Sequence, residues 1–279
     1  MKYLFLSLLL IAFVFYYGKA LACTIFNANQ DNIVLVGNNE DWNYSTDVEV
    51  WFVPSTRESY GRVCFGWNQF LFLQVAQGGV NDQGLFFDWA LCPKSNPPKF
   101  SFKKKIATFS LPENLLAKCS TVDEAIRWLK QYNFLYIRSH IMLVDKSGAS
   151  AVIEWVKGKM VVIKKKHNYQ VITNFWLSHP ELGKFPCRRY DKVTEMMEKR
   201  NETSVEYFSS ILKTVSQYKR MEDGEETGTI YSNVYDLVNG EVYIYYKRDL
   251  ENPIKFNLEK ELKKGKHSYK LKSLFLKGN

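Results

Sequence analysis

Strand-like and helical segments follow one another in blocks along this chain, not one by one. Strand-like segments dominate from Thr24 to about residue 91; a helical pair, a second block of strands, a second helical pair and two more strands follow. Strictly alternating strands and helices would indicate a parallel sheet, whereas segregated blocks favour an α+β fold. Two sheets between helical layers would satisfy this order, although the pattern alone leaves the topology open.

The predicted strands are short, rich in β-branched and aromatic residues, and bounded by Gly, Asn, Asp or Pro. The first block contains Thr24–Phe26, Ile33–Gly37, Val48–Val53, Arg62–Trp67, Phe70–Ala76 and Leu85–Trp89, with a tight turn between the last two within Gly79–Leu85. The second block contains His140–Asp145, Ala151–Val156, Met160–Ile163 and Tyr169–Thr173. The final two strands, Ile230–Leu237 and Glu241–Lys247, are joined at Asn239-Gly240, which is typical of a hairpin.

Helix signals are clear in two places. Thr121-Val122-Asp123-Glu124 is a capping box, which predicts a helix from there to about Tyr132. A second helical pair is predicted at about Arg188–Arg200 and Val205–Val215. Because no internal repeat or linker interrupts the pattern, we expect residues 23–279 to form one domain.

The first 22 residues have the pattern of a secretory signal peptide. Lys2 gives a positive start, Tyr3–Tyr17 is almost wholly apolar, and Ala20-Leu21-Ala22 has the small-x-small form of a cleavage site. A membrane anchor is the alternative, but the apolar run is shorter than the roughly 20 residues that span a bilayer. We therefore expect cleavage after Ala22, a secreted or periplasmic protein, and no stable membrane insertion after processing.

Cleavage there would make Cys23 the first residue of the mature chain. Cys23 would then carry both a thiol and a free α-amine, whose pKa of about 7.7–8.0 leaves part of it neutral near pH 7. Such an amine can act as base for its own thiol, so no separate histidine is needed. Two alternatives are an ordinary cysteine and a lipidated one. Against lipidation, Ala20 stands where lipoproteins commonly carry Leu, and a strand begins directly at Thr24.

The other cysteines, the histidines and the charge suggest no further chemistry. Four cysteines remain, which allow three disulfide pairings, and no CxxC pair indicates a structural zinc site. None of the four histidines lies in a signature of papain-like enzymes, and His140 is expected in the core. The net charge of +9 comes partly from lysine runs, for which a solvated basic face is the preferred interpretation. No metal, cofactor or nucleic-acid partner is expected.

Several short motifs along the chain share one family pattern. Cys23-Thr24-Ile25-Phe26 followed by Gly37-Asn38-Asn39-Glu40-Asp41-Trp42 resembles the start of the choloylglycine hydrolase family. That family includes penicillin V acylases and bile salt hydrolases, is related to acid ceramidase and N-acylethanolamine hydrolases, and consists of N-terminal nucleophile hydrolases. The resemblance continues in family order through Gly79–Leu85, Ser147-Gly148, Val152-Ile153-Glu154, Val171–Asn174, Arg189-Tyr190 and Val234–Leu237.

This resemblance implies a fold, a reaction and four site residues. The fold would be αββα, two antiparallel sheets between helical layers. Cys23 would attack the amide carbonyl, and Asp41 would bind and orient its amine. Asn174, with a backbone N–H near Leu91, would form the oxyanion hole. Arg189 would lie near the thiol and favour the thiolate, although Arg188 beside it leaves the register open.

The implied activity is cofactor-free hydrolysis of a linear amide bond in a small N-acyl compound, through a thioester on Cys23. Acyl transfer to an amine is an alternative within the family, and a secreted or lipidated binding protein without catalysis is an alternative outside it. The oligomeric state is left open. Trp42, Trp67 and Trp89 are expected near the site and suggest an apolar acyl pocket.

Two positions depart from the family pattern. Asn38 stands where many members have arginine, and Leu91 stands where they have asparagine. The loss of a positive charge near the nucleophile argues against substrates that carry a carboxylate, such as conjugated bile salts.

Overall fold

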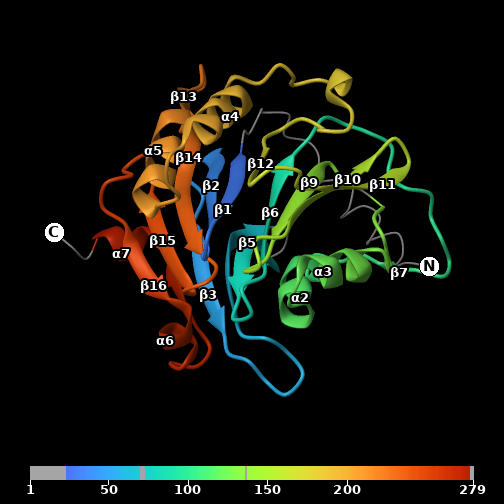
Figure 1. Cartoon of the computed structure of the whole chain (residues 1–279), viewed down its shortest axis with the longest axis horizontal. Helices are drawn as coiled ribbons and strands as arrows, with labels where there is room; N and C mark the ends of the chain where they lie inside the picture. The colour runs from blue at the N-terminus through green and yellow to red at the C-terminus, as the bar shows by residue number, and fades with distance from the viewer. Residues whose placement is uncertain (1–22, 70–72, 136, 277–279) are drawn as a thin grey trace.

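The protein is a four-layer sandwich in which two antiparallel sheets lie face to face between two layers of helices (Figure 1). The computed structural model describes residues 23–69, 73–135 and 137–276. The predicted αββα arrangement is confirmed. The expected signal peptide, residues 1–22, lies outside the described residues.

Cys23 lies at the start of the first sheet's second strand. That sheet has the order β12-β1-β2-β14-β15-β16, and a short strand, β13, extends it by pairing with β14. Its strands are β12 (Tyr169–Ile172), β1 (Thr24–Gln30), β2 (Ile33–Asn43), β14 (Glu226–Asp236), β15 (Glu241–Tyr246), β16 (Ile254–Asn257) and β13 (Tyr218–Arg220).

The second sheet has the order β11-β10-β9-β6-β5-β4-β3-β17. Its strands are β11 (Lys159–Lys164), β10 (Ser150–Val156), β9 (Ser139–Val144), β6 (Phe86–Leu91), β5 (Leu73–Asn81), β4 (Arg62–Gln69), β3 (Glu49–Val53) and β17 (His267–Lys270). A separate parallel pair joins β7 (Lys105–Ile106) and β8 (Tyr132–Asn133).

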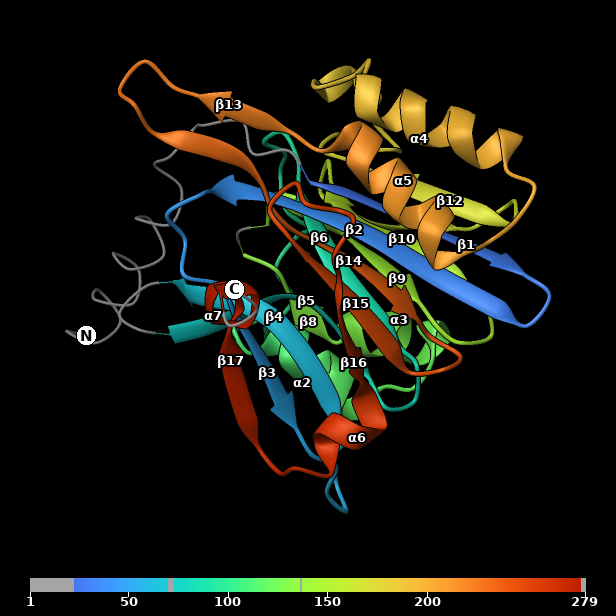
Figure 2. The same ribbon diagram turned by 90° about the vertical axis from the view of Figure 1, so that its left-hand side faces the viewer.

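Helices cover the outer face of each sheet. Figure 2 shows α4 and α5 over the first sheet, near β1, β2 and β12, while α2 and α3 pack on the second. The helices are α2 (Leu111–Lys118), α3 (Val122–Leu129), α4 (Arg188–Lys199), α5 (Val205–Val215), α6 (Leu258–Leu262) and α7 (Leu271–Leu276), with a 3₁₀ turn at Pro180–Leu182.

The alternation of side chains along each strand builds three apolar layers. In β1, Ile25 packs between the sheets and Phe26 packs under α5, because successive side chains point to opposite faces. In β2, Val36 likewise packs between the sheets, and Leu35 packs on the outer face with Phe26. Any inward-facing polar residue on these strands therefore lies in an otherwise apolar layer, where it needs a partner.

Most predicted strands and helices are confirmed, but two expectations about boundaries are wrong. The helix that begins after Thr121 ends at Leu129 and not near Tyr132, because Tyr132 pairs in β8. The hairpin at Asn239-Gly240 is present, but it does not end the strands, since β16 and β17 follow. Helix α2 is the other member of the first helical pair, for which no bounds were predicted. Residues 70–72 of the predicted strand Phe70–Ala76 lie outside the described residues.

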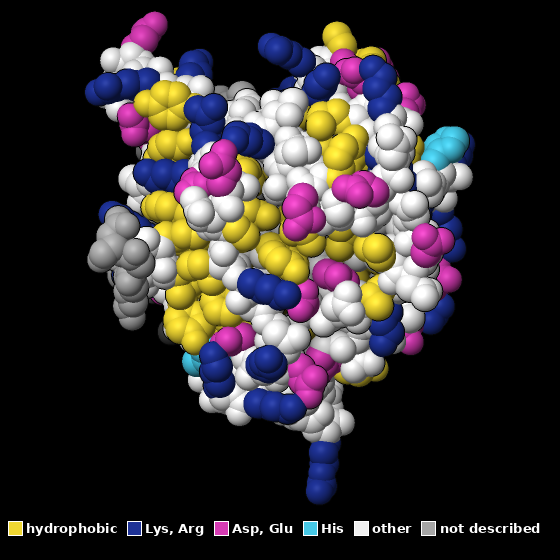
Figure 3. All heavy atoms as spheres, turned by 60° about the vertical axis from the view of Figure 1, so that its left-hand side comes forward, with side chains coloured by type: hydrophobic (Ala, Val, Ile, Leu, Met, Phe, Trp, Pro, Cys, Tyr) yellow, Lys and Arg dark blue, Asp and Glu magenta, His cyan; other side chains and the backbone are white. Residues whose placement is uncertain are grey.

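The surface and the cysteines add few constraints. On the face in Figure 3, Lys and Arg side chains are interspersed with Asp and Glu. In the part of the chain that the structure describes, no helix is long and apolar enough to cross a bilayer. All five cysteines fall in this part and are free thiols.

Candidate active site

Cys23 lies at the N-terminal end of β1 with its side chain between the two sheets. Its side chain belongs to the inner core and is only 6% exposed. Its sulfur lies 3.6 Å from Glu40 Oε1, and the thiol donates this hydrogen bond. Burial, followed by the charges of Glu40 and Asp41, raises the pKa of the Cys23 thiol well above its usual value, although a backbone hydrogen bond at Asp41 opposes this. The thiol therefore needs a nearby proton acceptor before it can react as a thiolate.

Arg189, in the first turn of α4, connects two of the predicted site residues. Its Nη1 donates to the carbonyl oxygen of Cys23 at 2.5 Å and to Thr24 Oγ1 at 2.6 Å, and its Nη2 donates to Asn174 Oδ1 at 2.9 Å. The guanidinium thus contacts the main chain of Cys23, and no hydrogen bond joins it to the sulfur among the described residues. This geometry places Arg189, and not the exposed Arg188, against Cys23, and its effect on the thiol stays a prediction.

Asn174 follows β12 and is buried. Its Nδ2 donates to the carbonyl oxygen of Leu91, at the end of β6, at 2.9 Å. Since an amide NH₂ carries two protons, this bond leaves one N–H for another acceptor. Leu91 and Asn174, predicted to meet at an oxyanion hole, are therefore in contact, and the carboxamide is held at both its oxygen and its nitrogen.

The carboxyl of Asp41 lies on the other face of β2 from the Cys23 side chain. Thr229 Oγ1 donates to its Oδ1 at 2.6 Å, and Gln217 Nε2 donates to its Oδ2 at 3.2 Å. Burial raises the pKa of Asp41 to about 7, even though Thr229 and Arg189 act to lower it. The backbone of Asp41 thus lies beside Cys23, while its carboxyl is held by Thr229 and Gln217. The role of this carboxyl toward the α-amine stays a prediction.

A group of polar residues between the sheets was not predicted. Asn38 and Glu40 of β2 share the inner face with Cys23, and Asn38 Nδ2 donates across the sandwich to Asp88 Oδ2 at 2.8 Å. A Cβ at Gly78 would lie 2.2 Å from that same oxygen, so glycine makes room for Asp88. The alternation along β2 was a usable signal, because residues 38 and 40 share one face.

Two of the three expected tryptophans lie near the site. Trp42 and Trp67 both belong to the inner layer, with ring centroids 5.3 Å apart. The expectation for Trp89 is wrong, because this residue faces outward on β6. Its indole donates to the carbonyl oxygen of Ala76, and its ring packs edge-on against Phe87 under α2 and α3.

His140 lies in the core as expected, but it belongs to a buried ion pair. Its Nε2 lies 2.7 Å from the carbonyl oxygen of Thr173, and its Nδ1 lies 3.2 Å from Glu154 Oε1. Both partners are acceptors, so both ring nitrogens carry protons. Glu154 also accepts from the backbone N–H groups of Leu177, at 2.6 Å, and Ser178, at 3.1 Å. The pair therefore fixes both ends of the loop that carries Asn174.

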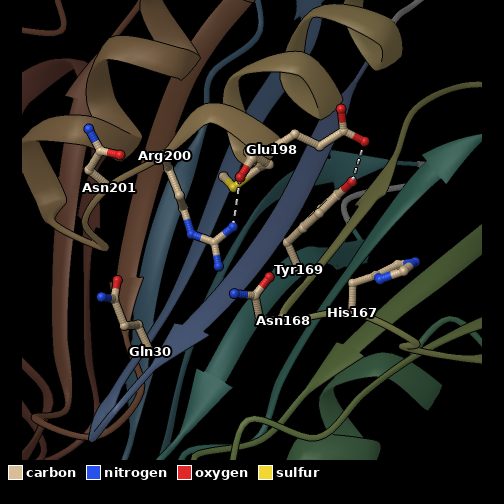
Figure 4. A pocket seen from close by; sticks show the side chains of 8 residues that line it. Gln30, His167, Asn168, Tyr169, Glu198, Arg200 and Asn201 are labelled. Carbon is tan, nitrogen blue, oxygen red and sulfur yellow. Dashed lines mark hydrogen bonds between the residues drawn. The ribbon is translucent and has the colours of Figure 1, made fainter.

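A surface hollow of about 430 Å³ lies away from Cys23, and Figure 4 shows its lining side chains at the end of α4. Arg200 donates there to the carbonyl oxygen of Met197, and Tyr169 donates to Glu198. Gln30, on its rim, ends β1 at the opposite end from Cys23, roughly 20 Å away at the usual rise per residue. This hollow is not part of the candidate active site.

Sequence comparison identifies relatives of the chain. The model of a family described as acyl-coenzyme A:6-aminopenicillanic acid acyl-transferase matches residues 28–251. Penicillin V acylase from Pectobacterium atrosepticum is 26% identical over 200 residues, which cover 60% of this chain and 53% of that protein. The chain thus spans about half the length of this curated relative.

Structural comparison finds the same fold in two kinds of enzyme. A variant of conjugated bile acid hydrolase from Clostridium perfringens matches with a TM-score of 0.71 and 19% identity, over 89% of this chain and 97% of that one. Penicillin V acylase from Agrobacterium tumefaciens matches with a TM-score of 0.65 and 20% identity, over 84% and 85% of the two chains. At these identities, the likeness shows the fold alone.

Proposed function

Because the chain belongs to the acyl-coenzyme A:6-aminopenicillanic acid acyl-transferase family, we propose that it hydrolyses linear amide bonds of small N-acyl compounds with Cys23 as the nucleophile. The observation that carries this proposal is the hydrogen-bonded chain from Cys23 through Arg189 to Asn174. A nucleophile and a buried amide donor are thereby held in one rigid unit, as acyl transfer requires.

The reaction has two halves. The Cys23 sulfur attacks the carbonyl carbon, the carbonyl oxygen takes up negative charge near the free N–H of Asn174, and the C–N bond breaks to release the amine. Water then hydrolyses the thioester and restores the thiol. Asn174 suits this role because Arg189 holds its oxygen, which leaves its nitrogen directed away from that cation.

The proposal includes removal of residues 1–22. Only cleavage before Cys23 creates the α-amine that accepts the thiol proton, and the adjoining carboxyl of Asp41 would bind that amine. Export would supply the cleavage, so a secreted or periplasmic location belongs to the same proposal. The thiol's raised pKa supports it, because the buried sulfur needs a base close at hand.

The acyl group is proposed to be apolar and without a carboxylate. Trp42 and Trp67 offer an aromatic surface in the inner layer to which Cys23 belongs. Burial raises the pKa of both Glu40 and Asp88 in this layer, so it disfavours negative charge, and Asn38 supplies no positive charge. A carboxylate in the acyl group would therefore be buried there without a counter-ion.

The test is a panel of N-acyl amides, penicillin V and acyl homoserine lactones, incubated with protein that begins at Cys23. Rapid quenching and intact mass should show the acyl group's mass added to wild-type protein, and neither adduct nor turnover with Cys23→Ala. Turnover by Cys23→Ala would contradict the proposal. Added diacylglycerol mass on the exported protein would instead support a lipidated binding protein.

Acyl transfer to an amine is the second candidate, because the family description names an acyl-transferase. The two reactions share the thioester and differ in what attacks it. Adding a primary amine to the same assay separates them: a new amide as the main product indicates transfer, and the free acid indicates hydrolysis.

A further inference from the structure

The Cys23 thiol contacts a carboxyl to which the mechanism above gives no role. Glu40 Oε1 lies 3.6 Å from the sulfur, within hydrogen-bond distance for a thiol. Glu40 is only 3% exposed, and it makes no ion pair with a Lys, Arg or His among the described residues. A carboxyl in such a place is normally satisfied by a specific partner or held neutral.

The second oxygen of this carboxyl has no hydrogen-bond partner in the described part of the chain. Glu40 Oε2 is fully buried, as is the hydroxyl of Tyr231, which lies directly opposite Glu40 on β14 and is also without a partner. Burial and the nearby charge of Asp41 raise the pKa of Glu40 to about 8, although the side chains of Cys23 and Asn38 act to lower it. At neutral pH, Glu40 is therefore mainly a neutral acid, and its second oxygen has no hydrogen-bond partner among residues 23–69, 73–135 and 137–276.

Processing would create an acceptor beside this oxygen. The pairing of Thr24 with Asn39 places Cys23 beside Glu40 on neighbouring strands. Within one cysteine, the backbone nitrogen and Sγ are three bonds apart, which places them roughly 3–4 Å from each other depending on the side-chain rotamer. A carboxyl that contacts the sulfur through one oxygen is thus within reach of the new amine through the other.

We propose that Glu40 is the proton relay between the thiol and the α-amine of Cys23, and so a further catalytic residue. This inference rests on the proposed function. It explains why an acidic side chain lies in the apolar layer against the nucleophile, and it uses both carboxyl oxygens.

The relay moves two protons in one step. The Sγ–H bond breaks and its proton forms a bond to Glu40 Oε1, while the proton on Oε2 passes to the neutral α-amine. The electron pair left on sulfur forms the bond to the substrate carbonyl carbon, and the π pair moves onto the carbonyl oxygen. Glu40 is a neutral acid before and after the step, and the new ammonium holds the proton that the departing amine needs.

The test compares wild-type and Glu40→Gln protein, both beginning at Cys23, by single-turnover release of amine from an N-acyl amide that the wild type cleaves. Glutamine keeps the shape but cannot pass a proton between its two ends. We expect acylation to slow ~100-fold or more, with substrate affinity little changed. In mixtures of H₂O and D₂O, the wild-type acylation rate should depend on deuterium fraction along a curve, as expected for two moving protons.

Asp88→Asn is the matched control, because it also replaces a buried carboxyl of the same group by an amide, but at a residue for which the structure records no contact with the sulfur. It should keep the curved isotope dependence. A Glu40→Gln rate within about threefold of wild type, or a linear wild-type dependence, would overturn the relay. The wild-type measurement needs no substitution, so it decides even if Glu40→Gln fails to fold.

Failure of the relay and failure of the proposed function give different results. If Cys23→Ala remains active, the nucleophile is wrong and both ideas fall. If Cys23→Ala is inactive while Glu40→Gln acylates normally, only the relay is wrong.

Discussion

Under the proposed mechanism, Asn174 is the residue whose contacts bear most directly on rate. Its carboxamide is held by Leu91 at one end and Arg189 at the other, so it donates from a fixed position. A donor that needs no reorganisation is most effective where charge develops in the transition state.

We predict that Asn174→Ala folds normally but loses ~10²–10³-fold in kcat, the usual effect of removing one oxyanion donor. The thiol should remain titratable, which alkylation of Cys23 followed by mass spectrometry would verify. A near-wild-type kcat on any good substrate would place the oxyanion hole elsewhere.

Arg189 and Arg188 offer a matched pair. Arg189→Lys should lower kcat at least ~10-fold, because a single ammonium cannot keep the fork-like contacts to Cys23, Thr24 and Asn174. Arg188 is exposed, so Arg188→Lys should leave the rate within about twofold. Steady-state kinetics of both variants check this, and equal effects would mean that Arg189 has no special role.

At the scale of elements, one buried ion pair links β9, β10 and the loop after β12. Burial opposes the charge on His140, but neighbouring Cys92 and Glu154 outweigh it and raise the pKa of His140 to about 10. Burial likewise opposes the charge on Glu154, yet His140 and Ser178 hold the pKa of Glu154 below its usual range. The pair is thus charged across the neutral range.

Glu154→Gln should destabilise the protein by about 3–5 kcal/mol, because it leaves an imidazolium buried without its counter-ion. Urea unfolding would measure this. The exposed Glu198→Gln is the control and should change the free energy of unfolding by less than about 0.5 kcal/mol. Similar values for the two variants would show that the ion pair contributes little.

The same pair predicts a pH dependence of stability. Because folding raises the pKa of His140 above about 6.5, its contribution is fully present below that pH and is lost as pH rises through about 10. The difference in unfolding free energy between wild type and His140→Gln should therefore shrink between pH 7 and 10. A difference that stays constant would show that His140 is neutral.

Short runs of β-branched and aromatic residues, bounded by turn residues, carried enough information to predict most of both sheets, because strands that are buried on both faces read as such runs. This signal failed for β16 and β17, which are short strands in a lysine-rich region at sheet edges. The contact of Arg189 with Asn174 was beyond such reasoning, since it depends on how α4 docks against the loop after β12. Glu40 was accessible from strand alternation but is surrounded by residues with stronger family signals.

At the scale of the whole molecule, the sandwich places Cys23 where, under the proposed mechanism, its amine would decide activity. The sulfur lies between the sheets near the backbone of Asp41, Arg189 holds the carbonyl oxygen of Cys23, and the expected cleavage site is at the same residue. The proposal therefore predicts that folding and activation are separable: the chain would fold around an uncleaved Cys23, and the base would exist only after cleavage.

The most direct test compares two forms of the protein, one beginning at Cys23 and one with a retained Met before it. The extension turns the amine into a peptide nitrogen, which cannot accept a proton near neutral pH, while the thiol and Glu40 are unchanged. Mass and circular dichroism establish the terminus and the fold, and the rate on one responsive substrate is the measurement. We predict that the extended form is folded and inactive and that removing its Met restores activity. Equal rates, with the Met still present by mass, would contradict the N-terminal nucleophile mechanism.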